Sequence, residues 1–498
     1  MYYHGVRTEE KATSMPTVAV VSSGLQVVIG TAPVHILENP EKVTNVPVLV
    51  EDYEDAVEKI GYSDDFDKYT ICQSVSANFE LLQASPIVCI NVLDVTKNKK
   101  AMDEISLDTT AKKEYTFDSS DVILKSIVVK KESDTLVRGT DYLLNVGDDL
   151  RITITIINET VTGTLTITAD QVSYEADDMA LQIIGGYSAA TGKNSGISCV
   201  NDVFPKLQQV PGQILAPGYS QKKEVAVALS VAAVNINDEV NAQALVDLDT
   251  TLVKKVEDVP DAKETLGIIS SQTTILWPMV KVNGKTYAYS AYMAGLCVKC
   301  DEDNDGIPSV SPSNLSMNIS AMVLQDGTEV ILDKKRANNY CNAVGVVTAI
   351  NYAGWKSWGN NTAAYPSVTD PKDRWICVRR FMSYYRNRLL LTYAEKVDRP
   401  TDPRQVQAIC DSENIWFNSM KSDYRIAGGR IEYREEDNTT EDILNGKVTF
   451  RIYLATYLPS EDIRFIVEFD PTILKEALGG ESLKKRNFRQ PRNKGHSK

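Results

Sequence analysis

The stretch that most constrains the fold is residues 374–470, because two kinds of periodicity follow each other there. Helical patterns cover 375–397 and 403–420, and the second begins with Asp402 as a candidate N-cap and Pro403 at the first helical position. Its apolar side chains recur on one face: Val406, Ile409, Cys410, Phe417 and Met420. The sequence therefore predicts a helix pair with a buried face.

Strand patterns come after the helices. Val448, Phe450 and Ile452 alternate with polar residues, and Phe465 and Val467 do the same further on. This alternation predicts a small antiparallel sheet with one buried and one wet face, and hence a C-terminal α+β domain over 361–480. Such a sheet has edges, and an uncovered edge strand is a template for another chain.

The N-terminal half has a different pattern, in which continuous apolar runs alternate with helical segments. The runs cover 25–31, 86–93 and 211–218, and the helical segments cover 52–60, 74–83 and 224–235. Strands that are apolar on both faces are typical of a sheet covered by helices on both sides. We therefore expect a discontinuous α/β core domain over 21–95 and 206–360.

Residues 96–205 interrupt that pattern. A charged stretch, 97–113, is followed by short segments rich in Thr and Ile, separated by turns at Gly139, Gly147 and Gly163; the segments are 126–131, 142–146, 150–157 and 164–169. This predicts an inserted all-β domain, a small sandwich. Because an insert leaves and re-enters its host at adjacent points, we expect it on the exterior of any assembly.

Composition limits the partners and the compartment. The 498 residues suffice for about three domains, and the formal charge is −14. Residues from 371 onward carry 24 Lys and Arg against 19 Asp and Glu, whereas the preceding residues carry 29 against 48. Because no basic helix interleaved with aromatics accompanies this asymmetry, it favours an acidic protein partner and no direct nucleic acid.

No apolar run approaches ~18 residues, so we expect no membrane insertion. The eight cysteines lie mostly singly in apolar segments and predict a reduced protein without disulfides.

Motifs that carry chemistry are few. Cys297 and Cys300 form a C-x-x-C pair, but a zinc site needs four ligands and no second pair follows. Residues 301–306 begin like a calcium loop, yet Pro312 occupies the position of the bidentate Glu. Glycine-rich phosphate loops and G-x-S-x-G are absent from the sequence, which contains only three histidines. We therefore expect no catalytic, metal or cofactor site, no cofactor, and a protein that is not an enzyme.

Two further groups suggest interfaces. The arginines Arg379, Arg380, Arg386 and Arg388 spread over more than one helix face, which favours ion pairing across subunits. Trp355 and Trp358 lie in a polar loop, where they are either interface anchors or fold back on their own domain.

Several motifs, taken in order, carry a resemblance to a known family. They are YHGVRTEE, QVVIGTAP, PGQILAPGYS, SAYMAGL, WKSWGNNT, RRFMSYYRNRL, DPRQV, a glycine pair before a strand, NTTEDILNGK and a strand ending in FD. In this order they resemble contractile tail sheath proteins, which occur in contractile-tailed phages and in headless phage-tail-like bacteriocins. The resemblance covers nearly the whole chain outside about 95–205.

The resemblance implies a structural subunit made in the bacterial cytoplasm and located in a virion tail or tail-like particle. In that family, stacked hexameric rings surround an inner tube and contract to drive it through a bacterial envelope. The implied partners are further copies of the chain, the tail tube protein, and baseplate and tail-terminator proteins. A non-contractile surface or capsid-like scaffold, or an enzyme with an unrecognised site in the α/β core, remain the alternatives.

The resemblance also implies extended terminal arms that link subunits by strand exchange, an N-terminal arm over 1–20 and a basic C-terminal tail over 481–498. Residues 3–8 are either a disordered terminus or this arm, whose residues would be Tyr3, His4, Gly5, Val6, Arg7 and Thr8. The acceptor sheet would comprise Val448, Phe450, Ile452, Phe465 and Val467. Arg404 and Lys421 are candidates for contact with acidic residues of the tube, or are solvated surface charges.

Overall fold

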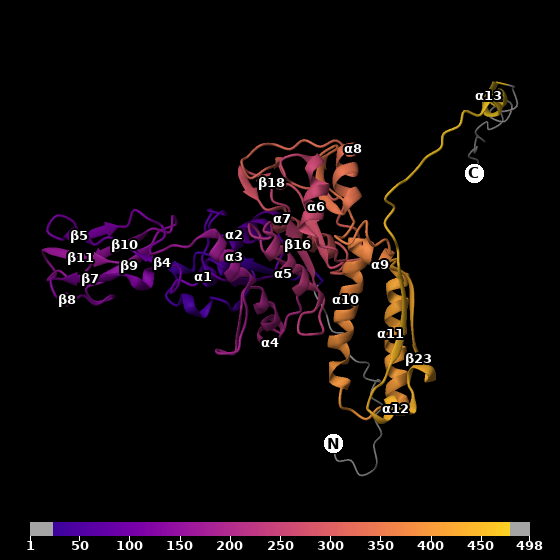
Figure 1. The fold of residues 1–498 in the computed structure, drawn as a ribbon, viewed down its shortest axis with the longest axis horizontal. Coiled ribbons are helices and arrows are strands. Elements are labelled where there is room, and N and C mark those ends of the chain that lie inside the picture. The colour runs from indigo at the N-terminus through magenta and orange to yellow at the C-terminus, as the bar shows by residue number, and fades with distance from the viewer. Residues whose placement is uncertain (1–22, 479–498) are drawn as a thin grey trace, which may run out of the picture. The chain divides into compact units, whose positions relative to one another are not determined.

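The computed structural model describes residues 23–478 of the chain (Figure 1). The chain divides into two units, Met1–Leu458 and Pro459–Lys498, which are described separately. The first unit is built on an eight-stranded sheet in the order β2-β3-β1-β15-β16-β17-β21-β22. Its six inner strands are parallel, whereas β2 and β22 pair antiparallel to β3 and β21 at the two edges. The strands are β1 Gln26–Gly30, β2 Pro47–Val50, β3 Ile87–Asn91, β15 Gln213–Leu215, β16 Gln243–Asp247, β17 Thr273–Leu276, β21 Val346–Asn351 and β22 Trp355–Trp358.

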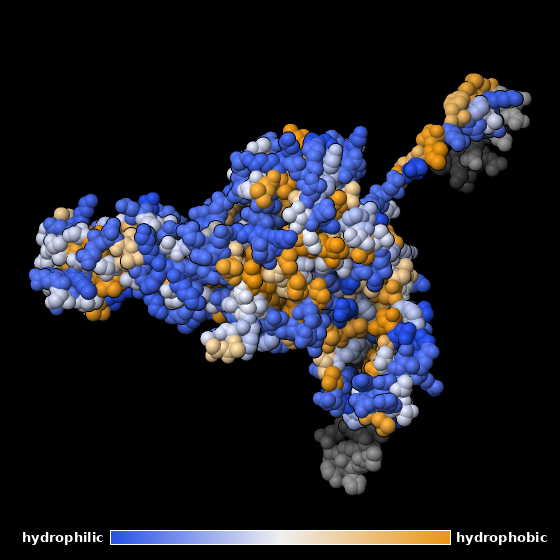
Figure 2. Space-filling model, viewed as in Figure 1, coloured by the Kyte–Doolittle hydropathy of each residue, from blue (hydrophilic) through white to orange (hydrophobic). Residues whose placement is uncertain are grey.

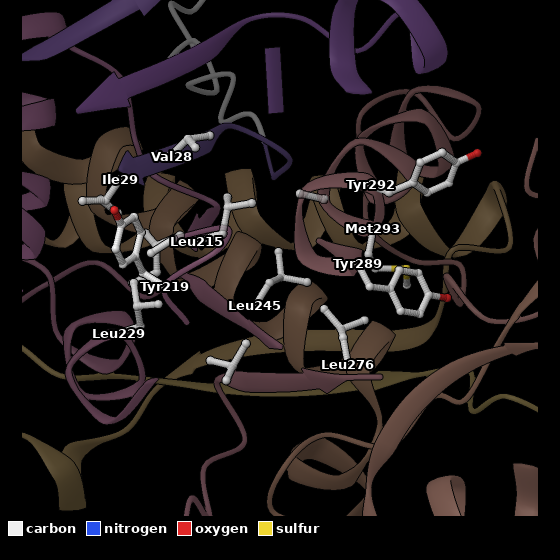
Figure 3. Close-up of a cluster of buried hydrophobic side chains, with 14 of the residues drawn as sticks. Val28, Ile29, Leu215, Tyr219, Leu229, Leu245, Leu276, Tyr289, Tyr292 and Met293 are labelled. Carbon is white, nitrogen blue, oxygen red and sulfur yellow. The ribbon is translucent and has the colours of Figure 1, made fainter. Parts of the chain in front are cut away.

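Helices cover both faces of this sheet. Figure 3 shows Leu229 of α5 (Lys223–Val234) on one side of the strand residue Leu245, and Tyr289 and Met293 of α7 (Tyr289–Glu302) on the other. All four side chains are buried in one large hydrophobic cluster. The predicted α/β pattern is therefore confirmed over this part of the chain, including α1 (Tyr53–Ile60), which Gly61 terminates at positive φ.

The remaining elements of the main body are short. A three-stranded sheet contains β18 Met279–Val282, β19 Lys285–Tyr287 and β20 Ala321–Val323. The helices are α2 Ile71–Val75, which continues as a π-helix over Ser76–Leu82, α4 Val203–Leu207, α6 Val259–Leu266, α8 Lys334–Arg336 and α9 Pro371–Arg374.

The inserted region forms two antiparallel sheets around a second hydrophobic cluster. The sheets have the orders β6-β10-β9 and β5-β11-β7-β8, and both contribute to the cluster, which includes Phe117, Ile154 and Ile167. Four of the predicted segments are strands: β7 Val128–Lys131, β9 Tyr142–Val146, β10 Ile152–Ile156 and β11 Thr164–Thr168. The others are β4 Lys99–Ala101, β5 Ile105–Asp108, β6 Glu114–Thr116, β8 Asp134–Thr135, β12 Asp170–Val172, β13 Gly186–Ser188 and β14 Lys193–Ser195. Two sheets around one cluster make the predicted small sandwich.

The expectation that 96–205 is all β is wrong at its C-terminal end. Residues Ala176–Ile184 form the helix α3, and Met179 and Ile183 are buried in the main cluster rather than in the cluster of the sandwich. The helix forms because its apolar residues recur at helical spacing and pack next to α5. The domain limits themselves remain a prediction.

Polar contacts join the sandwich to the main body. The Nε2 of buried His35 donates a hydrogen bond to the carbonyl oxygen of Ser120 at 2.8 Å, and Arg138 forms an ion pair with Glu38. Burial lowers the pKa of His35 to about 4, so this imidazole is neutral at physiological pH.

The first unit ends in a helical hairpin and a two-stranded sheet. The helices are α10 Ile376–Tyr393 and α11 Pro403–Ser422, and the strands are β23 Ile426–Tyr433 and β24 Phe450–Thr456, with α12 (Thr440–Leu444) between them. The N-cap prediction is confirmed, since the Asp402 carboxylate accepts a hydrogen bond from the backbone N–H of Gln405 at 2.8 Å.

The second unit corrects the predicted third strand. Residues 459–470 contain no helix or strand, and α13 (Pro471–Leu478) is the only element of this unit among residues 459–478. The segment has the alternation of a strand, but a strand is completed by a neighbouring strand, and no described strand pairs with 459–470.

Candidate functional site

The candidate site is the C-terminal sheet of β23 and β24 with the helix α11 that supports it. Phe417 and Ile431 are buried between helix and sheet, and Phe450 and Ile452 pack against them. Phe417 also explains the glycine pair: a Cβ at Gly429 would lie 2.5 Å from the Phe417 ring, whereas one at Gly428 would meet nothing within 4 Å. The close approach fixes the sheet on the helix.

This sheet has two open edges. β23 pairs only with β24, so within the described part of the chain each strand leaves one edge without a strand partner. An isolated pair of strands is marginally stable in water, and here packing on α11 supplies the support. Open edges seven to eight residues long offer backbone hydrogen bonds to any extended segment of suitable pattern.

The second unit contains an extended apolar segment. In residues 463–469, Ile463, Phe465, Val467 and Phe469 alternate with Arg464, Ile466 and Glu468. All four alternating apolar side chains are exposed, Phe465 by 85% and Val467 by 91%. Large apolar side chains exposed in sequence at strand spacing indicate a segment that is completed by a partner.

A buried ion pair joins the two helices beneath the sheet. The guanidinium of Arg388 in α10 donates to the Glu413 carboxylate in α11 at 2.8 Å, and neither side chain is exposed. The hydroxyls of Tyr385 and Tyr393 also donate to Glu413, at 3.0 and 2.7 Å, and Arg388 lies 4.5 Å from the centroid of the Trp416 ring. Burial, together with the Glu413 charge, raises the pKa of Tyr385 far above its usual value.

Arg380, two turns earlier in α10, makes a second buried pair. It donates in a bidentate manner to Asp301 at the end of α7, with Nη1 to Oδ1 at 2.9 Å and Nη2 to Oδ2 at 2.5 Å, and the Ser23 hydroxyl donates to the same carboxylate at 2.7 Å. The prediction that Arg380 and Arg388 pair across subunits is therefore wrong, because both guanidinium groups are buried and each is paired with a carboxylate of the same chain. Arg379 contacts Asp373 at 3.3 Å, and Arg386 is exposed and forms no ion pair with any residue of 23–478.

The structure does not bring the remaining predicted interface residues together. Arg404 and Lys421 are both exposed on α11, but 17 residues separate them, which is about 25 Å along a helix axis. Val448 lies in the loop before β24, and the arm residues 3–8 lie outside the described residues. Phe450 and Ile452 lie in β24, whereas Phe465 and Val467 lie in no described strand, so the predicted acceptor sheet is wrong at those two residues. The acceptor role of the β23–β24 sheet and the tube contact of Arg404 and Lys421 remain predictions.

The two tryptophans fold back on their own domain. Trp355 and Trp358 belong to β22 and pack against the main cluster, and the Trp358 indole N–H donates to the Asn338 side chain at 2.7 Å. These contacts explain both residues without an external partner.

The candidate chemical motifs are structural. Cys297 and Cys300 are free and buried, and burial raises their thiol pKa values to about 11 and about 12, so both are protonated at neutral pH. The acidic 301–306 loop is bound by arginines, since Arg425 pairs with Asp305 and Arg380 with Asp301. Among residues 23–478, no group of three or more His, Cys, Asp or Glu side chains is placed to hold a metal ion.

In enzymes with an open α/β sheet, ligands bind at the carboxyl ends of the parallel strands, so we inspected that edge of the sheet for polar side chains. Asp247 ends β16 there, buried, and accepts hydrogen bonds from the Ser220 hydroxyl at 3.0 Å and from the backbone N–H and hydroxyl of Ser290 at 2.8 and 2.5 Å. Burial raises the pKa of the Asp247 carboxyl, although the hydrogen bonds from Ser220 and Ser290 act to lower it. Because Ser290 lies in the first turn of α7, the carboxylate fixes that helix to the sheet.

No described helix is long and apolar enough to cross a bilayer.

The open sheet edges and the exposed strand-like segment are features at which another chain can add. Comparison with known sequences shows which class of protein the chain is similar to. The tail sheath protein of Burkholderia phage BcepMu is 25% identical over 507 residues, spanning 96% of this chain and 99% of that protein. A putative prophage major tail sheath protein of Pseudomonas aeruginosa (strain UCBPP-PA14) is 25% identical over 60% of this chain and 75% of its own length. No family model matches the sequence.

Solved structures share the fold. The sheath complex of an extracellular contractile injection system, PVC, in its contracted state aligns with a TM-score of 0.58 at 13% identity, over 95% of this chain and 99% of that one. The contracted helical sheath of the anti-feeding prophage aligns with a TM-score of 0.57 at 14% identity, over 94% and 99%. Sequence and fold thus agree on contractile tail sheath proteins as relatives of this chain and support a structural sheath subunit.

Proposed function

We propose that this chain is the repeating sheath subunit of a contractile particle, in which stacked hexameric rings surround an inner tube and shorten to drive it through a bacterial envelope. The observation that carries the proposal is the pair of complementary features in one chain: a two-stranded sheet with open edges, and an exposed seven-residue strand pattern over 463–469. Each feature is incomplete alone, and a second copy supplies what the first lacks.

In this proposal, 463–469 of one copy adds to an edge of the β23–β24 sheet of a neighbour. Its seven residues match the seven residues of β24, and the backbone of the added strand satisfies the open edge. Burying Phe465 and Val467 contributes roughly 1.5–3 kcal/mol for each side chain. The N-terminal residues 3–8 add to the opposite edge in the same way, so that each subunit is linked to others by two arms.

A contact of this kind is heterologous, since the arm and the sheet are different surfaces. Repetition of a heterologous contact gives a ring where the rotation closes and a helical filament where it does not. Arms that remain paired while the bodies reorient allow a lattice to change its pitch and diameter without falling apart. The inserted sandwich lies on the outside, and α11 with Arg404 and Lys421 faces the tube.

Negative-stain electron microscopy of three purified chains tests the proposal: the full chain, a chain lacking 1–14, and the double substitution Phe465→Asp with Val467→Asp. We expect hollow tubes from the full chain, and monomers or loose rings from the other two. A matched control, Glu468→Gln, changes the opposite face of the same segment and keeps the tubes.

Two outcomes would overturn the proposal. Monodisperse particles from all the chains would show that the protein does not polymerise, and would favour the alternative that it is an enzyme or a monomeric binding module. Tubes that keep one length and one diameter under every condition, including contact with a baseplate, would leave a non-contractile scaffold.

A further inference from the structure

A groove of about 690 Å³ lies between the end of α5, the loop 269–272 and α10. Three apolar side chains line it and are exposed although they belong to the well-packed first unit: Val231 by 67%, Ile269 by 60% and Val234 by 47%. Figure 2 shows apolar surface gathered on the face that carries α5. An exposed apolar wall in a groove is a surface at which an apolar group of another chain can bind.

The charge that lines the groove is positive. Arg379 and Arg386 of α10 line it, and none of the described residues that line it is acidic. Arg386 is exposed and forms no ion pair with any residue of 23–478, whereas Arg379 contacts Asp373 at 3.3 Å. The group that fits this groove is therefore apolar and carries negative charge beside its apolar side chains.

The helix α12 presents this chemistry on another surface of the same unit. Ile443 is exposed by 51% and Leu444 by 82%. Glu441 is exposed in the same helix and forms no ion pair with any residue of the described chain. Residues 435–442 carry five acidic side chains, two of which pair with arginines of the sheet, and no basic one. We call the surface of Glu441, Ile443 and Leu444 the α12 knob.

The connection that carries the α12 knob is held in one shape by hydrogen bonds. The backbone N–H of Asp442 donates to the Thr439 hydroxyl at 3.2 Å, which caps the helix. The side-chain N–H groups of buried Asn438 donate to the carbonyl oxygens of Arg434 and Thr449 at 2.8 and 2.9 Å. Its side-chain oxygen accepts from the backbone N–H of Thr449 at 2.7 Å. Apolar side chains on such a preorganised connection lose little conformational freedom on binding, which favours a role as an interface anchor.

Charge favours the α12 knob over the other exposed apolar helix of the chain. The helix α13 also exposes apolar side chains, namely Ile473, Leu474 and Leu478. It carries one lysine and one glutamate, so its charges balance, whereas the residues leading into the α12 knob are acidic. Because the α12 knob and the groove are both exposed in the same chain, neither covers the other within it, and a second copy can supply the missing surface.

We propose that the α12 knob of one copy binds in the groove between α5 and α10 of another copy. Ile443 and Leu444 pack on the apolar wall of the groove, and Glu441 pairs with Arg386. The contact is heterologous, since the α12 knob and the groove are different surfaces, so its repetition builds a ring or a filament.

This contact deepens the proposed function and rests on it in one respect, because the partner is another copy of the chain. It joins folded bodies and requires neither residues 3–8 nor residues 463–469. A lattice held in this way has a second kind of link, which can break and form again while the arms remain paired.

Photo-crosslinking between copies of the full chain tests the inference. Equal amounts of ¹⁵N-labelled and unlabelled chain, each with a benzophenone amino acid in place of Leu444, are mixed before assembly and irradiated. After trypsin digestion, we expect the fragment that carries residue 444 of one label to be joined to fragment 224–254 or 264–281 of the other label. A control chain carries the probe at Val137, which is exposed on the inserted sandwich, and should give no such product.

Substitutions in the probe-carrying chain locate the contact. Arg386→Glu or Glu441→Arg alone should lower the yield of the product about fivefold, and the two together should restore it, because the charges are then exchanged. Ile269→Asp should lower the yield about tenfold or more, since the apolar contact is lost. The matched control Val137→Asp should leave it unchanged. All the altered side chains are exposed, so circular dichroism should report the same fold in every variant.

The outcomes separate this contact from the proposed function. Products that join the two labels at these fragments, with the yield restored by the charge exchange, support the contact. Tubes without this product leave the proposed function standing and overturn the contact, whereas monodisperse particles without it overturn both. The contact is also overturned if a probe at Leu474 of α13 gives the product and the probe at 444 does not, or if the product joins only chains of the same label.

Discussion

Arg388 and Glu413 face each other at 2.8 Å between α10 and α11 with neither side chain exposed to solvent. The carboxylate also accepts hydrogen bonds from Tyr385 and Tyr393. The pair therefore fixes both the rotation of each helix and the distance between them, in the hairpin that supports the β23–β24 sheet.

Replacing Glu413 by Leu should destabilise the chain by about 3–5 kcal/mol, because it leaves the Arg388 cation buried without a counter-charge. The double substitution Arg388→Met with Glu413→Leu should recover most of this loss, since apolar residues of similar size need no charge partner. Denaturant unfolding followed by tryptophan fluorescence measures both. As a control, Lys372→Ala removes the exposed ion pairs of that residue and should change stability by less than about 1 kcal/mol. A double variant no more stable than the single one would contradict this account.

Substituting Gly429 by Ala should destabilise the sheet by roughly 1–3 kcal/mol, because the new methyl group would overlap the Phe417 ring. The neighbouring Gly428→Ala is the matched control, since its Cβ enters open space. Phe417→Leu in the Gly429→Ala background should recover part of the loss. Thermal unfolding of the four chains is the measurement, and equal melting temperatures for the two alanine variants would refute the close approach.

Stability should fall in mild acid through His35. The pKa of this imidazole is about 4 in the folded chain against 6.5 for an exposed histidine, so the unfolded chain binds more protons between these values. The stabilisation is complete above pH 6.5 and is lost as the pH falls toward 4, to a total of about 3 kcal/mol. His35→Gln keeps a donor for the Ser120 carbonyl without a titrating ring. Denaturant midpoints measured for both chains from pH 7.5 to pH 4 should converge as acidity increases, and parallel profiles would refute the role of His35.

Charge reversal on α11 should weaken tube binding if that helix faces an acidic tube. Arg404→Glu and Lys421→Glu are exposed, so they should leave folding unchanged while reducing co-sedimentation with preformed tubes. The loss should be largest at low ionic strength, because salt screens such contacts. Lys112→Glu, exposed on the inserted sandwich, is the control. A loss of the same size in all three variants would indicate a general charge effect and refute the contact.

Much of the fold follows from local pattern and could be predicted. Asp402 and Pro403 mark the start of α11, Gly61 marks the end of α1, and continuous apolar runs such as 86–93 are inner strands of the parallel sheet. These signals are local, because caps, turns and periodicity act within a few residues.

The site was less predictable because its important contacts are distant in sequence. From the sequence alone, Arg388 would be taken for a surface charge. Its partner Glu413, however, lies three residues after Cys410 and four before Phe417, which places it on the apolar face of α11. A carboxylate at that place in the pattern indicates a buried partner, and this was the available signal. The segment 463–469 shows the opposite case: its pattern is correct for a strand, but pairing depends on a partner that the chain does not provide.

Arg380 and Arg388 lie eight residues apart on α10, about 12 Å along its axis. The first is bound to α7 of the main body and the second to α11 of the hairpin. A load that pulls the hairpin away from the main body would have to separate one of these buried guanidinium groups from its carboxylate, so α10 joins the two parts through its side chains. If the chain works as the proposed sheath subunit, we expect its deformation in the connections beyond these two ion pairs.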